Sequence, residues 1–244
     1  MSEKVALITG GARGIGRAIG LELAVKGWSV AVCYRTSESD AVQTIKEITE
    51  RGGKGLHFKC DVSDPAACDE LVKNVEAEWG SIDALINCAG PYHRRNLLKE
   101  TVEGWHEMFD NNLHPVFYLS RAVATGMKER GWGRIINFSM ANADKLIAQT
   151  EITAHYIAKA GVLILTRSLA RALAPDGITV NAISPGFINS GSAPEDELEA
   201  MVKRIPAGYI GSTKDAVDAA LYLLSDEAAY VNGTNIHLSG AWGL

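Results

Sequence analysis

The chain has 244 residues, of which 47% are hydrophobic and 22% are charged, and its formal net charge is −5 at pH 7. This length and balance fit a soluble α/β protein that buries its core without disulfides or metals. The chain has no basic stripe, so a nucleic-acid partner is not expected, and no apolar run reaches the length of a membrane span. The N-terminus reaches the glycine turn at Gly10 too early for a signal-peptide core, so we expect a cytoplasmic protein.

The four cysteines, Cys33, Cys60, Cys68 and Cys88, do not show the CxxC or Cys/His spacing of metal sites. Three of them fall in or beside apolar, strand-like runs, where a reduced thiol behaves as a small hydrophobic side chain. The pattern therefore favours buried structural thiols over a redox role, and we expect no metal site.

Short runs rich in Val and Ile alternate along the chain with longer segments of helical period. The predicted strands are 5–9, 29–33, 55–59, 84–87, 134–138, 179–183 and 235–238, and the predicted helices begin near residues 14, 40, 65, 105, 153, 195 and 213. Strands joined by helical, right-handed crossovers form a mostly parallel sheet that is buried on both faces. The predicted fold is a single Rossmann-type domain over 1–244, with a doubly wound parallel sheet of seven strands and helices on both faces.

The first predicted strand runs into the segment "TGGARGIG", residues 9–16, and then into a helix. Gly10 permits the tight turn, Gly14 lets the backbone approach a pyrophosphate, and Gly16 allows close packing of helix on strand. The helix N-terminus then presents free N–H groups to the phosphates. The strand–turn–helix context favours a dinucleotide-binding loop over a glycine-rich turn without a ligand.

The end of the second predicted strand indicates which dinucleotide is bound. NAD sites usually have an acidic residue there, which bonds the ribose 2′-hydroxyl. This chain instead has Tyr34 followed by Arg35, and Arg13 in the glycine loop adds a second cation. Two guanidinium groups suit a 2′-phosphate, which they can hold bidentately. We therefore predict NADP(H) rather than NAD(H), the alternative being that both arginines are solvated surface residues.

Several motifs occur together in this order: the glycine spacing TGxxxGxG, "DV" at 61–62, "NCAG" at 87–90, "NNL" at 111–113 and "SPGFINS" at 184–190. With them the chain resembles the short-chain dehydrogenase/reductases over nearly its whole length, and its C-terminal part is most similar to 3-oxoacyl-carrier-protein reductases. The resemblance implies an oxidoreductase that interconverts a carbonyl and a secondary alcohol. To the loop residues Gly10, Arg13, Gly14, Ile15 and Gly16 and to Tyr34 and Arg35, the resemblance adds as cofactor contacts Asp61, Val62, Asn87, Ala89, Gly90, Lys159, Pro185, Gly186, Ile188 and Ser190. The alternative is that Asp61 is a helix cap and Pro185–Gly186 only a turn.

The proton-transfer residue departs from the pattern of the resembled family. There, a Tyr transfers the proton, and a Lys four residues later on the same helix lowers the phenol pKa toward working pH. In this chain Lys159 occupies the lysine position, but four residues before it lies His155, and Tyr156 is one residue too late.

The residues that orient the carbonyl depart as well. The family places a catalytic Ser at the end of the fifth strand, where this chain has Met140 preceded by Ser139. The interval from Met140 to His155 is two residues longer than usual, so Asn142 could come nearest the carbonyl. The Asn that completes the family's proton relay corresponds most naturally to Asn112.

Three interpretations follow from these departures. His155 could replace the Tyr, because an ordinary imidazole pKa of about 6.5 suits proton transfer; Lys159 would lower that pKa and favour a base for alcohol oxidation. Tyr156 could instead act from a shifted turn, since positions three and four residues apart lie on one helix face. Finally, the redox chemistry could be lost, which would leave a nucleotide-binding paralogue with a sensing, partner-binding, lyase or isomerase role.

The sequence signals for the substrate and for the oligomeric state are less specific than those for the cofactor. The segment 90–98 contains Tyr92, His93, Arg94 and Arg95, which could meet an anionic group such as a carboxylate or a carrier phosphopantetheine, or form a solvated loop. The expected substrate is a small molecule or an acyl thioester. A short lid is expected near 190–210, which suits a small molecule. The helices over 114–129 and 156–173 carry more apolar surface than one sheet face would cover, so we expect a homotetramer, with a dimer as the alternative.

Overall fold

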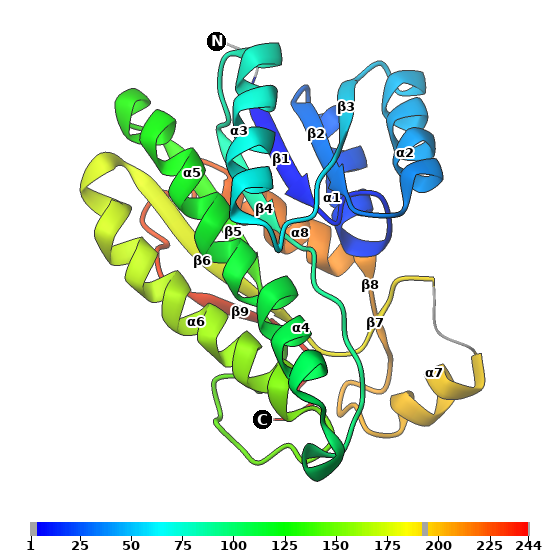
Figure 1. The fold of residues 1–244 in the computed structure, drawn as a ribbon. Coiled ribbons are helices and arrows are strands. Elements are labelled where there is room, and N and C mark those ends of the chain that lie inside the picture. Colours follow the sequence, from blue (N-terminus) through cyan, green and yellow to red (C-terminus); the bar gives the residue numbers. More distant parts are fainter. Residues whose placement is uncertain (1–3, 192–194, 244) are drawn as a thin grey trace.

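A seven-stranded parallel sheet runs through the centre of the molecule, in the strand order β3-β2-β1-β4-β5-β6-β9 (Figure 1). The structure, a computed structural model, describes residues 4–191 and 195–243. The strands are β1 (Val5–Thr9), β2 (Ser29–Tyr34), β3 (Lys54–Lys59), β4 (Ala84–Asn87), β5 (Gly133–Phe138), β6 (Ile178–Pro185) and β9 (Asn235–Leu238). β1, β2, β4 and β5 are buried throughout, because their apolar runs are covered from both faces. The predicted fold is confirmed.

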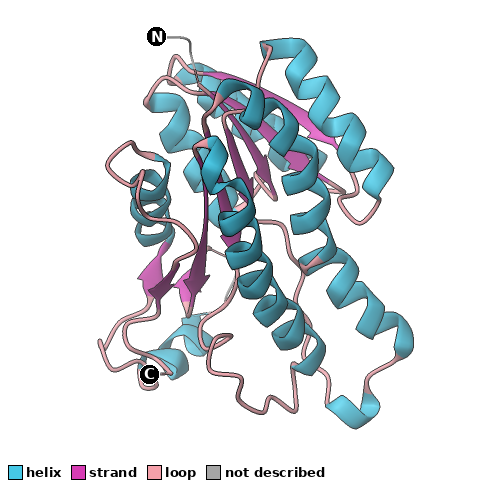
Figure 2. Ribbon diagram, turned by 90° about the vertical axis from the view of Figure 1, so that its left-hand side faces the viewer, coloured by secondary structure: helices cyan, strands magenta, loops and turns pink. Residues whose placement is uncertain are grey.

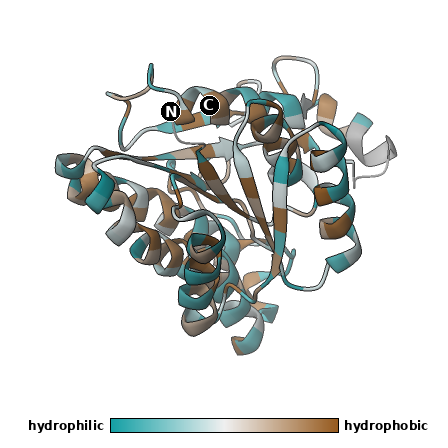
Figure 3. Cartoon of the chain, turned by 90° about the horizontal axis from the view of Figure 1, so that it is seen from above, coloured by the Kyte–Doolittle hydropathy of each residue, from teal (hydrophilic) through white to brown (hydrophobic). Residues whose placement is uncertain are grey.

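Helices cover both faces of the sheet (Figure 2). The helices are α1 (Gly14–Val25), α2 (Glu38–Glu50), α3 (Pro65–Trp79), α4 (Val102–Asn112), α5 (His114–Arg130), α6 (Thr153–Leu173), α7 (Glu195–Val202) and α8 (Thr213–Leu224). Helices α1, α2 and α8 pack on one face, and α3, α5 and α6 pack on the other, with α4 against α5 and α6. Apolar residues gather on the strands and on the inner sides of the helices, whereas polar residues lie outside (Figure 3).

The structure adds detail that the periodicity does not contain. The helix expected from residue 105 is part of a pair, because α4 ends and α5 begins around Leu113, two residues before Pro115, which has no N–H to continue a ladder. Two short 3₁₀ turns, Leu97–Lys99 and Ala174–Asp176, complete the helical segments.

A second, two-stranded sheet lies beside the main one. It pairs β7 (Ile188–Asn189) with β8 (Gly211–Ser212), and α7 lies in the chain between them (Figure 1). This region corresponds to the lid expected near 190–210, of which residues 192–194 lie outside the described part of the chain.

The fold brings the loops after β1 and β4 together. The strand order reverses between β1 and β4, and in open α/β sheets ligands bind at such a switch point, outside the carboxyl ends of the strands. The Thr9 hydroxyl at the end of β1 accepts hydrogen bonds from the backbone N–H groups of Cys88 and Ala89, both at 3.1 Å. Within the described residues, no helix is long and apolar enough to cross a membrane.

Candidate active site

A cavity of about 970 Å³ opens at this switch point. Its lining combines the glycine loop, the end of β2, the segment after β3 and the segment after β4. Among the residues predicted to bind the cofactor, those on the lining are Gly10, Arg13, Gly14, Ile15, Gly16, Tyr34, Arg35, Asp61, Val62, Ala89, Gly90 and Ser190. The remaining ones, Asn87, Lys159, Pro185, Gly186 and Ile188, lie outside this lining.

The glycine loop can pack in this conformation only because it lacks side chains. Gly10 and Gly14 have φ of +65° and +57°, a region that other residues rarely adopt. A Cβ on Gly10 would lie 3.0 Å from the Cα of Ala89, and one on Gly16 would lie 2.6 Å from the Gly10 carbonyl oxygen. The backbone and the N-terminus of α1 therefore face the cavity directly, as a pyrophosphate requires.

Two arginines lie at the end of the cavity formed by β2, and each is oriented by a residue from another element. Arg35 Nη1 donates to Asn111 Oδ1 at 3.0 Å and lies 4.0 Å from the Asp61 carboxylate. Arg13 Nε lies 3.6 Å from the Asp40 carboxylate. Sequence patterns did not single out Asp40 or Asn111, although Asn111 belongs to the quoted "NNL" motif. Both guanidinium groups remain substantially solvated.

Lys159 is buried at the base of the site. Its Nζ donates to the carbonyl oxygen of Phe138, at the end of β5, at 2.9 Å. Burial lowers the pKa of Lys159 to about 8, because the charged ammonium loses its hydration. Lys159 therefore remains largely cationic at neutral pH but close to its titration range.

The side chains of Asn112 and Lys159 both lie against Gly90. A Cβ on Gly90 would lie 2.5 Å from Asn112 Oδ1 and 3.1 Å from Lys159 Nζ. Asn112 Nδ2 donates hydrogen bonds to the carbonyl oxygens of Pro91 and Met108, at 3.1 and 2.9 Å. Its buried Oδ1 has no partner among the described residues. An unpartnered hydrogen-bond acceptor and the Lys159 ammonium, which has N–H groups beyond the one bonded to Phe138, thus lie beside a glycine. This arrangement fits a hydroxyl-bearing ligand such as a ribose.

His155 is buried next to this point and is held through one ring nitrogen. It forms a hydrogen bond with the backbone of Pro91, while its Nδ1 is buried without a partner among the described residues. A carbonyl oxygen can only accept, so the ring nitrogen that contacts Pro91 carries the proton and Nδ1 presents a lone pair. Burial, the charge of Lys159 and the charge of His93 together lower the pKa of His155 to about 3.

Tyr156 points away from this arrangement. Its hydroxyl donates to the Asn142 carbonyl oxygen at 2.5 Å and accepts from the Ile147 N–H at 3.1 Å. Both partners belong to the loop 139–152, which joins β5 to α6. Tyr156 therefore anchors this loop.

The residues at the serine position are also engaged elsewhere. The Ser139 hydroxyl donates to the Lys159 carbonyl oxygen at 2.8 Å. The Met140 side chain packs against the small apolar cluster of Ala143, Leu163 and Ala182. Asn142 has a φ of +68°, and its side-chain amide lies against Gly243 in the C-terminal segment.

The segment after β4 forms a wall beside His155. The ring of Tyr92 packs edge-on against the His155 ring, with 5.3 Å between the centroids. Glu100 pairs with His93 at 2.9 Å and with Arg95 at 3.2 Å, so these two predicted anion contacts are already partnered. Backbone hydrogen bonds from Arg95 to Glu151 and from Leu97 to Thr150 join this wall to the loop 139–152.

The parallel sheet, the glycine loop at the switch point and the helix N-terminus behind it form an α/β site of the dinucleotide-binding type. Residues 10–241 match the family model described as enoyl-(acyl carrier protein) reductase. The chain belongs to the short-chain dehydrogenase/reductase family, and the resemblance found in the motifs is confirmed.

Curated relatives include 3-oxoacyl-[acyl-carrier-protein] reductases. The protein of Escherichia coli strain K12 is 37% identical over 97% of this chain and 96% of its own length. That of Staphylococcus aureus strain Mu50 is 38% identical over 97% of each chain.

Solved structures of the family share the whole fold. A Sinorhizobium meliloti protein assigned as a short-chain alcohol dehydrogenase superposes with a TM-score of 0.92 at 30% identity, over 99% of this chain and 97% of its own. An Agrobacterium tumefaciens protein assigned as a gluconate dehydrogenase gives the same score at 28% identity, over 99% and 96%.

Proposed function

We propose that this chain is an NADP(H)-dependent oxidoreductase that interconverts a secondary alcohol and a carbonyl, with His155 transferring the proton in place of the family's Tyr. The observation that carries the proposal is the orientation of the imidazole. Its protonated nitrogen is bound to the Pro91 backbone, and its Nδ1 lone pair is buried without a described partner. Such a nitrogen is an acceptor that a substrate hydroxyl can use.

The charge states of His155 and Lys159 favour alcohol oxidation. Because the pKa of His155 is lowered to about 3, its imidazole is neutral at working pH. It then acts as a weak base through Nδ1, and it holds no imidazolium proton for a ketone. Lys159, with its pKa lowered to about 8, supplies a nearby cation that stabilises an alkoxide. We therefore expect His155 to be a better base for alcohols than an acid for ketones.

The described residues fit a nicotinamide dinucleotide. Gly14 and the N-terminus of α1 would hold the pyrophosphate, Arg13 and Arg35 the 2′-phosphate, and Lys159 with Asn112 the ribose beside the reacting ring. The bound cofactor supplies the acceptor or donor of hydride, and the chain supplies position, charge and the proton path.

A second candidate is a nucleotide-binding protein without dehydrogenase turnover, with a sensing, partner-binding, lyase or isomerase role. It is favoured by the serine position, because the Met140 thioether is a poor hydrogen-bond partner for a carbonyl. The hydroxyls of Ser139 and Tyr156 are both bonded to backbone groups. Cofactor binding does not separate the two candidates, since both predict it.

Turnover separates them. We expect the absorbance of the reduced cofactor to change when the protein meets a panel of secondary alcohols with NADP⁺, or of ketones and β-ketoacyl thioesters with NADPH. Acyl thioesters belong in the panel because of the names of the curated relatives. If no substrate gives a rate above that of the Lys159→Met variant, the second candidate replaces the first.

Replacing Arg35 by alanine tests the cofactor preference. We expect the dissociation constant for NADPH to rise about 10- to 100-fold, the usual cost of a lost charge-assisted hydrogen bond, with little change for NADH. Fluorescence titration of the reduced cofactors measures both constants. Arg121→Ala is the matched control, since Arg121 is paired with Asp69 and does not line the cavity. Equal losses for NADPH and NADH in Arg35→Ala contradict the 2′-phosphate assignment.

We also propose that the chain forms a homotetramer, or failing that a dimer, through α5 and α6. Phe117, Ile157 and Ile164 on these helices are 48%, 43% and 63% exposed in the single chain. Apolar side chains at this exposure on adjacent helices favour burial against a second copy. Light scattering of the purified protein, compared with Ile164→Glu, measures the assembly, and a monomeric wild type contradicts it.

A further inference from the structure

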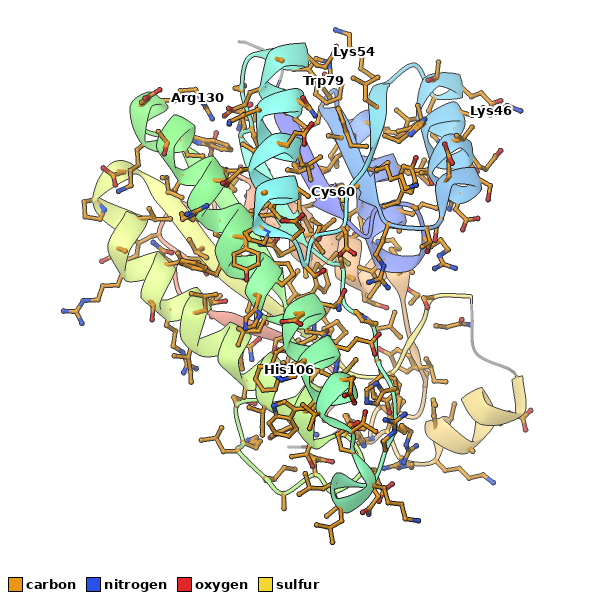
Figure 4. The ribbon with its side chains drawn as sticks, in the orientation of Figure 1. Lys46, Lys54, Cys60, Trp79, His106 and Arg130 are labelled. Carbon is orange, nitrogen blue, oxygen red and sulfur yellow. The ribbon has the colours of Figure 1, made fainter. Side chains whose placement is uncertain are left out.

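Three of the four cysteines meet at the adenine end of the cavity. Cys33 is on β2, Cys60 follows β3, and Cys68 is in the first turns of α3. Figure 4 labels Cys60 where the chain passes from β3 toward α3. Cys60 forms side-chain hydrogen bonds with both Cys33 and Cys68. The cluster is separate from His155 and Lys159, and the proposed proton transfer does not use it.

Cys60 combines the properties of a reactive thiol. The Cys33 thiol donates to the Cys60 carbonyl oxygen at 3.8 Å, so the two residues are in direct contact. Hydrogen bonding with Cys33 and Cys68 lowers the pKa of Cys60, whereas hydrogen bonding with Cys60 and burial raise the pKa values of Cys33 and Cys68. The thiolate is the nucleophilic form of cysteine. Cys60 also lines the cavity, so an oxidant as small as hydrogen peroxide can reach it.

Chain geometry selects which neighbour can bridge to Cys60. Cys33 is paired in register with Phe58, and Cys60 lies two residues further along. Strand spacing and rise place the Cα atoms of Cys33 and Cys60 about 8 Å apart, beyond the reach of a disulfide. Cys68 is not held in this sheet; its Sγ contacts the Val62 carbonyl oxygen at 3.3 Å, within the short connection from Cys60 to α3.

We propose that Cys60 and Cys68 are a site of oxidative modification, forming a disulfide when the protein meets a peroxide. The Cys60 thiolate attacks the peroxide, the O–O bond breaks, and Cys60 becomes a sulfenic acid. The Cys68 sulfur then attacks the Cys60 sulfur and releases water. In total, two thiols lose two hydrogen atoms and two electrons, and one hydrogen peroxide is reduced to two water molecules.

The bridge encloses the residues expected to contact the adenine. Asp61 and Val62 lie inside the ring that the disulfide closes, and the Asp61 carboxylate lies 4.0 Å from Arg35. Closing the ring moves this connection and changes the lining of the cavity. Oxidised protein therefore binds NADPH at least about tenfold more weakly. This last effect rests on the proposed function, whereas the disulfide itself does not.

Peptide mapping of the full chain tests the disulfide. Cleavage after Lys and Arg gives one peptide, 60–73, that contains both Cys60 and Cys68, and another, 27–35, that contains Cys33. After peroxide treatment and alkylation with iodoacetamide, we expect peptide 60–73 to be lighter by two hydrogen atoms and unalkylated, and dithiothreitol to reverse the change. The proposal is overturned if peptide 60–73 stays fully alkylated at a peroxide dose that oxidises the methionines, or if it is cross-linked to 27–35.

Cysteine variants, and the effect of NADPH on the rate of disulfide formation, provide the remaining tests. Cys60→Ser and Cys68→Ser each remove the internal bridge, and Cys88→Ser is the matched control that keeps it, since burial raises the pKa of Cys88 to about 12. Saturating NADPH slows bridge formation in the wild type, because the cofactor covers Cys60. The disulfide could also form at the same rate with and without NADPH and leave the NADPH affinity unchanged. That result supports the Cys60–Cys68 pair but contradicts the proposed placement of the cofactor over Cys60.

Discussion

Replacement of His155 by alanine is expected to lower kcat/KM for alcohol oxidation by about 10²- to 10⁴-fold, the usual contribution of a general base. The dissociation constant for NADPH should stay within about threefold, because the ring lies beside the proposed ribose pocket and away from the proposed phosphate site. Steady-state assays on the best substrate of the panel measure the first quantity, and fluorescence titration measures the second.

Two comparisons make this result specific. Free imidazole should restore part of the activity of His155→Ala, since the deleted ring leaves space of its own shape. Tyr156→Phe is the matched control: it removes the bonds to Asn142 and Ile147 and should cost about 1–3 kcal/mol of stability while keeping most of kcat. An inactive Tyr156→Phe beside an active His155→Ala would assign the proton to Tyr156 instead.

The buried imidazole is also expected to make stability depend on pH. In the unfolded chain His155 has an ordinary pKa of about 6.5, whereas in the folded chain burial lowers the pKa to about 3. Below pH 6.5 the unfolded chain therefore binds more protons than the folded chain. The contribution of His155 to the free energy of unfolding is complete above pH 6.5 and is lost as the pH falls toward about 3. Between pH 7 and pH 5 the linkage relation gives a loss on the order of 2 kcal/mol from this residue.

Urea unfolding of the wild type and of His155→Gln at the two pH values measures this loss. The variant should lose less stability on acidification, by about 2 kcal/mol, because glutamine does not titrate. His106→Gln is the matched control, since His106 is exposed on α4 (Figure 4), and it should behave as the wild type does. Parallel losses in the wild type and His155→Gln would mean that His155 is not held neutral by the fold.

Strand and helix positions could be predicted because their signals are local. The Val- and Ile-rich runs locate each strand of the main sheet, and the glycine spacing locates the phosphate loop. The break between α4 and α5 is also local, since Pro115 marks it, but the helical period continues through it and hides it. The pairing of β7 with β8 could not be predicted, because strands of two residues have no detectable period.

The candidate site could be predicted only in part. Spacing from Lys159 identifies His155 and Met140 as the residues at the key positions, but no spacing indicates where their side chains point. The partner of the imidazole, Pro91, comes from the segment after β4, and Arg35 is oriented by Asn111 from α4. Such partners are brought close by the crossover connections of the sheet, which place distant segments at one edge.

By itself, the sequence determined the parallel sheet, the glycine loop after β1 and the family, because glycine positions and apolar periods act through local backbone geometry. Only the tertiary structure decided that Tyr156 anchors a loop while the Nδ1 of His155 lies buried beside Lys159. It also decided that Cys68 contacts Cys60, which the spacing of the cysteines in the sequence does not indicate. The physical reason is the same in both cases: hydrogen bonding and pKa depend on distances between side chains, and the fold sets those distances.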